Sequence, residues 1–255
     1  MTDDQVADDQ VTDGSATGAT PPEAPELIWL RPERTGRGPR PAHSRDSIAA
    51  AAVAIADAEG LDAVSMRRVA AALGAGTMSL YNYVPKKEQL FDLMLDAVVG
   101  EYELPASPSG DQRTDLRLLF RRQLGILRRH TWVPRLVVGR PSLGPNGLRY
   151  TEYFLACLAD ADLPGSAKME ALSLLNGFLC QYAEWENTAA AGGKWQTDLV
   201  SYLQRVVLSG DYPHLTQALI SGGTGTPPDS DAIFDRTLQQ LISAVLTPTA
   251  PDPRG

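Results

Sequence analysis

The chain has 255 residues, of which 43% are hydrophobic, and it carries a formal net charge of −8 at neutral pH. This length allows one large domain or a small domain followed by a larger one, and the apolar fraction is ample for a packed core. No run approaches the ~18 uninterrupted apolar residues of a membrane-spanning helix, and no basic segment followed by an apolar stretch opens the chain, so we expect neither a membrane protein nor a secreted one.

Cysteine and histidine are too sparse to suggest a disulfide scaffold or a metal site. Cys157 and Cys180 are the only cysteines, which suits a reducing cytoplasm. His43, His130 and His214 are scattered and give no metal-ligand spacing with them. A thiol switch between the two cysteines is conceivable, but a buried free cysteine usually behaves as a small hydrophobic residue. We therefore expect no metal, no cofactor and a cytoplasmic protein.

The net charge hides an asymmetry along the chain. Residues 1–26 contain seven acids and no base, so the segment up to residue 30 is predicted to be a disordered acidic tail. The apolar run at residues 27–30 interrupts this polarity and is expected to dock against the folded part. Between Arg31 and Glu88, by contrast, nine bases outnumber six acids. Local basic charge of this kind favours a nucleic-acid surface.

Residues 31–44 are predicted to form a basic, extended arm, because their prolines and glycines prevent a helix. Arginine on such an arm can enter the narrow minor groove of A·T-rich DNA. Arg37 and Arg40, within the stretch GRGPRP, are the candidates for this contact. The alternative is a basic linker that contributes only non-specific attraction to phosphate.

Three short helices are predicted to follow the arm. The first begins at the cap Ser44 and ends before Gly60. The second begins after the cap Ser65, and glycines 74 and 76 then allow a sharp turn. The third covers residues 77–83 and is stopped by a proline. This order is typical of a helix-turn-helix DNA reader.

The sequence of residues 64–90, VSMRRVAAALGAGTMSLYNYVPKKEQL, resembles the tetracycline-repressor (TetR) family of bacterial transcription regulators. The resemblance covers about residues 44–95, a little over a fifth of the chain, and it is specific because order, spacing and punctuation agree together. It implies an all-α fold with an N-terminal helix-turn-helix domain and a larger helical domain for ligand binding and dimerisation.

The resemblance also implies a set of DNA contacts. Ser65 and Arg67 would contact phosphate or a base edge, and Thr77, Met78 and Ser79 would contact bases. Tyr81 would bond to phosphate, and Tyr83 would lie along the backbone or a thymine methyl. Lys87, at the positive end of the next helix, would pair with phosphate. Two positions depart from the family, which often has an aromatic residue at position 82 and usually histidine at position 83. Asn82 can instead bond adenine at N6 and N7, so the operator sequence cannot be transferred.

Two of these side chains have a structural alternative. Tyr81 can be a core aromatic residue with its hydroxyl in water, and Met78 can pack the turn. Arg68, next to the proposed contact Arg67, is expected to be a solvent-side charge and not a DNA contact.

The remaining chain keeps a helical period, and no stretch alternates like a strand. A connecting helix is predicted over residues 85–101, and residues 105–110 form a polar break. Further helices are predicted at residues 111–130, 132–139, 147–161, 166–191 with Ser166 as cap, 195–208, and 231–246 after a Gly/Pro-rich region at 209–230. We therefore expect a DNA-binding domain over residues 45–104 and a regulatory and dimerisation domain over residues 111–247.

Aromatic residues concentrate in the helix predicted at 166–191. Phe178, Tyr182 and Trp185 share one face at helical spacing. The candidate ligand site comprises these three with Trp132, Tyr153, Phe154, Asn176, Gln181 and Trp195. An apolar hollow with a few polar groups is the usual composition of a small-molecule site. Ordinary core or dimer packing is the alternative for each aromatic residue.

No catalytic motif is present in the C-terminal half, and we expect no enzyme. The preferred interpretation is a homodimeric repressor of double-stranded operator DNA, released by an unknown small molecule. A dimer doubles the short recognition helix and predicts a palindromic site, and the helices at 166–191 and 231–246 are candidates for its interface. An activator is the main alternative. An all-α small-molecule enzyme and a protein-binding adaptor are the alternatives from other classes.

Overall fold

The computed structural model of this protein describes residues 27–31, 43–137, 140–221 and 229–247. Within these ranges the secondary structure is helical and contains no strand, so the predicted all-α fold is confirmed. Residues 1–26 of the predicted acidic tail, and Arg37 and Arg40 of the basic arm, lie outside the described residues. The disordered tail was predicted to extend to residue 30, which was wrong, because residues 28–30 form a short 3-10 helix with Ile28 buried. None of the described helices is long and apolar enough to cross a membrane.

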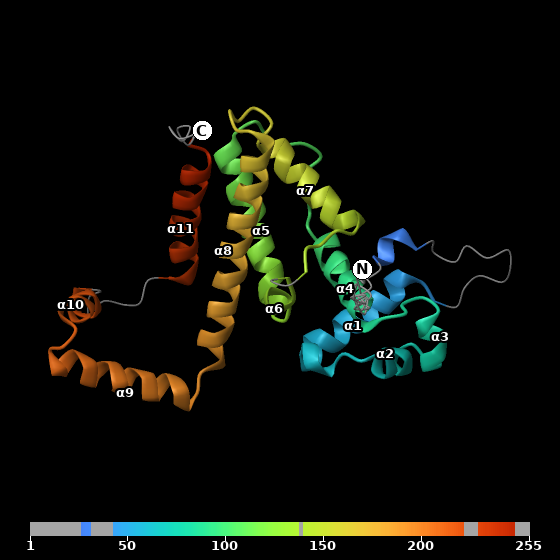
Figure 1. The fold of residues 1–255 in the computed structure, drawn as a ribbon, viewed down its shortest axis with the longest axis horizontal. Coiled ribbons are helices and arrows are strands. Elements are labelled where there is room, and N and C mark those ends of the chain that lie inside the picture. Colours follow the sequence, from blue (N-terminus) through green and yellow to red (C-terminus); the bar gives the residue numbers. More distant parts are fainter. Residues whose placement is uncertain (1–26, 32–42, 138–139, 222–228, 248–255) are drawn as a thin grey trace, which may run out of the picture.

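The elements follow one another with short connections, and most of the predicted helices are present (Figure 1). The N-terminal elements are η1 (Ile28–Leu30), α1 (Arg45–Glu59), η2 (Leu61–Ala63), α2 (Met66–Ala72), α3 (Thr77–Tyr81) and α4 (Lys87–Gly100). The C-terminal elements are α5 (Gln112–Arg129), α6 (Val133–Val137), α7 (Pro145–Cys157), α8 (Gly165–Ala191), α9 (Lys194–Ser209), α10 (Pro213–Ser221) and α11 (Ser230–Val245).

Three sequence predictions about these helices were wrong. Helix α10 lies inside the Gly/Pro-rich region that was expected to be a connection, because Pro213 occupies its first position, where proline is well tolerated. Helix α8 begins one residue before the expected cap Ser166, after Pro164, and has no side-chain cap. Helix α7 begins earlier and ends earlier than predicted, at Pro145 and Cys157, because the chain turns after Cys157.

Helices α1 to α4 form a compact head. Ser44 and Ser47 cap α1 reciprocally, since the Ser44 hydroxyl accepts from the Ser47 amide at 3.1 Å and the Ser47 hydroxyl accepts from the Ser44 amide at 3.0 Å. The alanine-rich face of α1 then packs closely on α4. Ile48 and Met94 are fully buried in this contact region.

The short apolar run before the arm docks on the body of the protein, as expected. Ile28 is fully buried. A Cβ atom added to Gly144 would collide with the ring of Trp29 and with the carboxyl group of Asp96, so η1 and α4 both lie against the start of α7. The sequence predicted the docking but not its place.

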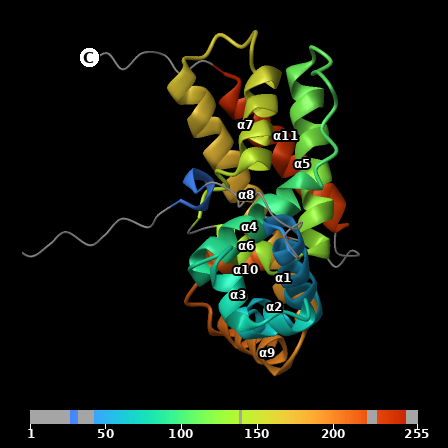
Figure 2. The same ribbon diagram turned by 90° about the vertical axis from the view of Figure 1, so that its right-hand side faces the viewer.

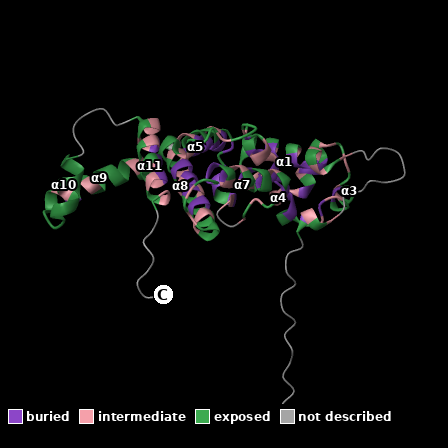
Figure 3. Ribbon diagram, turned by 90° about the horizontal axis from the view of Figure 1, so that it is seen from above, coloured by how far each residue is buried: buried purple, intermediate pink, exposed green. Residues whose placement is uncertain are grey.

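The larger body is a bundle in which α5, α7, α8 and α11 run beside one another above the head (Figure 2). Phe120 of α5 packs edge-on against Phe154 of α7, and Phe234 of α11 stacks on Phe178 of α8. Helices α9 and α10 project away from this bundle and are mostly exposed (Figures 1 and 3). The short α6 lies between the bundle and α4.

Candidate DNA-binding surface and ligand cavity

The turn between α2 and α3 is set by local residues. The Ser65 hydroxyl accepts from the Arg68 amide at 3.3 Å and so begins α2. Gly74 adopts φ +64°, a value that strains any residue with a side chain. The Ala75 amide then donates to the Ala70 carbonyl at 2.9 Å. These bonds end α2 and turn the chain so that α3 crosses it.

Helix α3 is held from below and presents its other side to solvent. Leu80 within it and Val84 after it are fully buried. Met78 is 78% exposed and Tyr81 is 41% exposed, so neither side chain is a core residue as the structural alternatives proposed. Ser79 and Asn82 are also exposed, whereas Thr77 and Tyr83 are half-buried. Polar, aromatic and thioether groups thus share an open surface.

Basic side chains flank this surface. Arg67 is exposed, and Lys87 is the first residue of α4, where the helix dipole adds positive potential. The Lys87 ammonium lies 5.2 Å from the centroid of the Phe91 ring, which supports its stem. Arg68, in contrast, donates to the Glu59 carboxylate at 2.9 Å and lowers the pKa of that carboxyl group. Its charge is therefore balanced within the protein.

A cluster of hydrogen bonds joins α1 of the head to the end of α5. The Asp57 carboxylate accepts from the Trp132 indole at 2.7 Å, and the same oxygen lies 2.7 Å from Nδ1 of His130. The other ring nitrogen of His130 lies 3.1 Å from Glu101, just beyond α4. We call this group of four side chains the α1 tie. His130 and Trp132 are buried, so water does not compete freely for these bonds.

Two further ties join α4 to the segment around α7. Arg140 donates to the Asp92 carboxylate at 2.8 Å and to the Glu88 carbonyl at 3.1 Å. The buried carboxylate of Asp96 accepts from the Gly147 amide at 2.9 Å and from the Asn146 side chain at 3.2 Å. Burial nevertheless raises the pKa of Asp96 above its ordinary value, although these hydrogen bonds act in the opposite direction.

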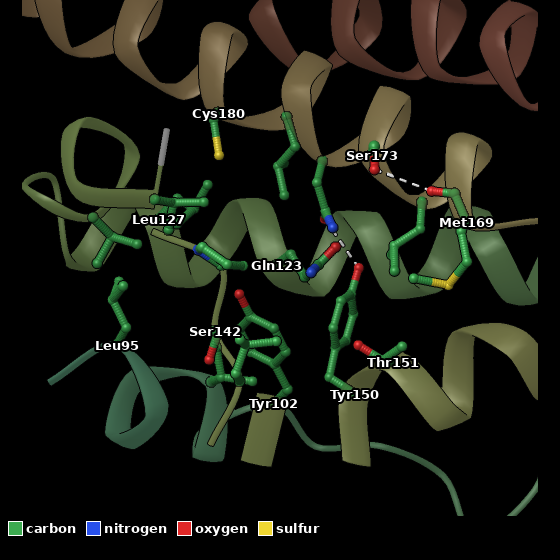
Figure 4. Close-up of a pocket in the computed structure, with 18 residues that line it drawn as sticks. Leu95, Tyr102, Gln123, Leu127, Ser142, Tyr150, Thr151, Met169, Ser173 and Cys180 are labelled. Carbon is green, nitrogen blue, oxygen red and sulfur yellow. Dashed lines mark hydrogen bonds between the residues drawn. The ribbon is translucent and has the colours of Figure 1, made fainter. Parts of the chain in front are cut away.

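A cavity of about 260 Å³ lies between α4, α5, α6, α7 and α8 and the loop at residues 141–143 (Figure 4). Its walls are mainly aliphatic, with polar groups at a few points. The Tyr150 hydroxyl donates to the Asn176 side chain at 3.0 Å. Gln123 Oε1 and Ser142 Oγ are buried there without any hydrogen-bond partner. A mainly apolar cavity with a few polar anchors can hold a small organic molecule.

Of the nine residues proposed for the ligand site, Asn176 lines this cavity and the other eight do not. Phe178 and Tyr182 pack on Phe234 of α11, and the Tyr182 hydroxyl donates to the Ser230 carbonyl at 2.6 Å. Gln181, Trp185 and Trp195 are exposed, the last of them on α9.

The remaining three proposed residues come from elements nearer the cavity. Phe154 is buried against Phe120, and Trp132 belongs to the α1 tie. Tyr153 lines a separate open hollow of about 760 Å³ beside residues 100–108. Gln123 carried a signal that the sequence reasoning did not use, because it is a polar residue within the apolar stripe of its helix.

A helix-turn-helix with an exposed recognition helix, attached to a helical bundle that contains a cavity, defines a DNA-binding transcription regulator. Residues 48–94 match the model of the bacterial regulatory proteins of the tetR family. Residues 104–248 match the model of the tetracyclin repressor-like C-terminal domain. The chain belongs to the tetR family.

Known relatives cover most of the chain. DrrR1, an HTH-type transcriptional repressor from Streptomyces coeruleorubidus, is 39% identical over 229 residues, which are 86% of this chain and 83% of the relative. An HTH-type transcriptional regulator from Saccharopolyspora erythraea is 32% identical over 226 residues, 87% of this chain and 92% of that protein.

A solved relative agrees in fold. The crystal structure of the TetR family protein ActR from Streptomyces coelicolor, in complex with actinorhodin, superposes with a TM-score of 0.69 at 30% identity. The alignment covers 80% of this chain and 97% of ActR. Family members bind DNA and small molecules and act as dimers. The chain is accordingly a DNA-binding transcription regulator, and the members of this family are not enzymes.

Proposed function

We propose that this protein is a homodimeric repressor that releases a palindromic operator when a small molecule occupies the cavity beside α6. The proposal rests on the position of the three groups of hydrogen bonds that join the head to the bundle. Each group includes a residue that is close in sequence to residues lining the cavity. The relatives support it, since DrrR1 is a repressor and ActR was solved with a bound small molecule. Action on chromosomal DNA places the regulator in the cytoplasm.

The ties give the cavity a mechanical connection to the head. Val133 and Val137 line the cavity on α6, and Trp132 of the α1 tie directly precedes them. Residues 141–143 line it from the loop, between Arg140 and Asn146 of the other two ties. A molecule that displaces α6 or this loop therefore pulls on α1 and α4. Because two recognition helices must lie about one DNA turn apart, roughly 34 Å, a ligand with higher affinity for another spacing lowers operator affinity.

The recognition surface is proposed to contain the contacts that the sequence indicated. Thr77, Met78 and Ser79 meet bases, and Asn82 reads one adenine. Tyr81 and Lys87 contact phosphate, Ser65 and Arg67 contact phosphate or a base edge, and Tyr83 lies along the backbone or a thymine methyl. Exposure of Met78, Ser79, Asn82 and the flanking cations supports this arrangement. Arg37 and Arg40 are proposed to add minor-groove contacts from the arm.

Substitutions at Lys87 and Asn82 should separate the two kinds of contact. Lys87→Glu should weaken binding to every sequence by about tenfold and reduce the salt dependence, because a phosphate contact is lost. Asn82→Ala should change the preference at one base position, by about 1–3 kcal/mol. The measurement is fluorescence anisotropy on a site selected from random DNA, and on single-base variants of that site.

Arg68→Gln is the matched control for these variants. Arg68 neighbours Arg67 but is bonded to Glu59, so the control should bind operator within about twofold of the unaltered protein. If Asn82→Ala weakened specific and random DNA equally, Asn82 would not read a base. If the selection enriched no inverted repeat, the proposed operator would be wrong.

The homodimer is proposed to involve the outer faces of α8 and α11 and the projecting α9 and α10. Large apolar side chains on α9, on α10 and in the turn between them are exposed to a degree that is unusual for a monomer: Trp195, Val200, Tyr202, Leu208, Tyr212, Leu219 and Ile220. On α8, Leu174 and Trp185 are also half exposed. A second copy of the chain would cover these groups.

Leu208→Asp should therefore shift the dimer towards monomer without unfolding it. Leu208 is 85% exposed, so the carboxylate meets water in the monomer and an apolar surface in the dimer. Sedimentation at low micromolar concentration should show the monomer. Leu148→Asp on α7, where the side chain is also more than half exposed, is the control and should remain dimeric. If both variants remained dimeric, α9 would not be part of the dimer interface.

A further inference from the structure

The cavity contains buried hydrogen-bonding atoms that the protein does not satisfy. Three side-chain atoms in the described part of the chain are buried and unpartnered, and two of them, Gln123 Oε1 and Ser142 Oγ, belong to cavity-lining residues. The third, Thr216 Oγ1, lies on α10. Buried polar atoms in native proteins are nearly always paired. Two unpaired atoms in one cavity therefore indicate that a partner from outside the chain completes it.

The neighbours of Gln123 determine which way its side-chain amide faces. Gln123 is 2% exposed, and the hydroxyl groups of Tyr102 and Tyr150 point towards its side chain in Figure 4. The Tyr150 hydroxyl already donates its proton to Asn176, so it can only accept from Gln123. The Gln123 nitrogen must then face the tyrosines, and its oxygen is left as an acceptor without a donor.

The described lining of the cavity also has no charged side chain that could balance the charge of an ionic ligand. Among its lining residues that the structure describes, none is Asp, Glu, Lys, Arg or His. Burial raises the pKa of Tyr102 and of Tyr150 far above the ordinary value, and it raises the pKa of Cys180 to about 11. These groups are therefore neutral at physiological pH. An ionic ligand would lose its hydration here and gain no counter-charge.

We propose that the effector of this regulator is an uncharged, mainly apolar molecule that donates a hydroxyl hydrogen bond to Gln123 Oε1. The proposal rests on the function proposed above and adds the chemistry of its ligand. A carbonyl oxygen can be satisfied only by a donor, and Ser142 Oγ, which can donate or accept, meets a second polar group. The volume of about 260 Å³ is just below the roughly 300–1,000 Å³ of typical ligand pockets, so the molecule is small.

Three probes of nearly equal size test this chemistry on the full chain at pH 7. They are 2-naphthol, which is neutral and donates, 2-methoxynaphthalene, which is neutral and cannot donate, and 2-naphthoate, which is an anion. Affinities are measured by calorimetric titration, and that of 2-methoxynaphthalene by its competition with 2-naphthol. We expect 2-naphthol to bind at least tenfold more tightly than either other probe. The proposal would be overturned by equal or tighter binding of the ether or the anion, or by no binding of any probe.

Gln123→Met keeps the length of the side chain and removes the acceptor, so it should abolish the preference for 2-naphthol over the ether. Gln123→Leu provides the same test if the first variant does not fold, which circular dichroism reports. Ser173→Ala is the matched control, because Ser173 lines the same cavity and its hydroxyl already donates to the Met169 carbonyl at 3.0 Å, so the preference should remain. A preference that persists without Gln123, or disappears with Ser173→Ala, would contradict the assignment.

Operator binding without probe is measured on the same samples by anisotropy. A protein that binds the probes in the expected order and no DNA would contradict the proposed function alone. A protein that binds its operator but ranks the probes differently would contradict the ligand chemistry alone.

Discussion

Replacing Asp96 with asparagine should lower the free energy of unfolding by about 2–3 kcal/mol, because it breaks a buried tie without changing its shape. The carboxylate accepts from the Gly147 amide and from Asn146, one with each oxygen. An asparagine offers one oxygen and presents an N–H group to the other donor, so a buried donor loses its partner. Relaxation is restricted, because Gly144 and the Trp29 ring pack directly against this side chain.

The pH dependence of this loss has a definite sign. Because folding raises the pKa of Asp96, the stability that its protonated form contributes is complete below the unfolded pKa of about 4 and is lost as pH rises through the folded value. The asparagine variant has no such titration. The difference in unfolding free energy between the two proteins should therefore be larger at pH 4.5 than at pH 7.5.

Urea unfolding of both proteins at the two pH values measures this difference, and the other titrating groups cancel in the comparison. Asp92→Asn is the matched control on the same helix. Its carboxylate makes one ion pair at a more exposed site, so we expect the smaller loss, about 1 kcal/mol or less. A difference that narrowed in acid would mean that the hydrogen bonds to Asp96 outweigh its burial.

The head could be predicted from the sequence because its structure depends on local signals. Ser65 caps a helix, Gly74 permits a positive φ, and Pro85 prevents continuation, and each acts within a few residues of its own position. The direction of Leu80 follows from helical period alone. Arg68 was expected to be a solvent-side charge and not a DNA contact, and in the structure its side chain pairs with Glu59.

The cavity could not be predicted in the same way because its walls are distant in sequence. Tyr102, Gln123 and Asn176 come from three parts of the chain, and only tertiary packing places them together. Aromatic spacing in α8 was correctly recognised, but Phe178 and Tyr182 face α11 and not the cavity. The partner of Trp132 is Asp57, 75 residues earlier, and no periodicity connects the two.

Loss of the α1 tie should leave operator binding and ligand binding intact and should remove the coupling between them. In Asp57→Ala, the Trp132 indole and the His130 ring lose their acceptor on α1, so movement of α6 is no longer transmitted to the head. A coupling free energy typical of allosteric proteins, about 1–3 kcal/mol, corresponds to a 5–150-fold loss of operator affinity on ligand binding. The variant should reduce this factor to near one, whereas its operator affinity without ligand changes little.

The measurement is operator anisotropy with and without a ligand found by screening for operator release. Trp132→Phe keeps an aromatic ring but removes the N–H donor together with part of the buried indole, so it should reduce coupling partly, and circular dichroism checks that the variant folds. Leu148→Ala, at an exposed position of α7 outside the α1 tie and the proposed dimer face, is the control and should respond like the unaltered protein. If both α1-tie variants released operator normally while Asp96→Asn did not, the signal would reach the head through α4 alone. Reciprocity adds a second test, since operator must weaken ligand binding by the same factor in each protein.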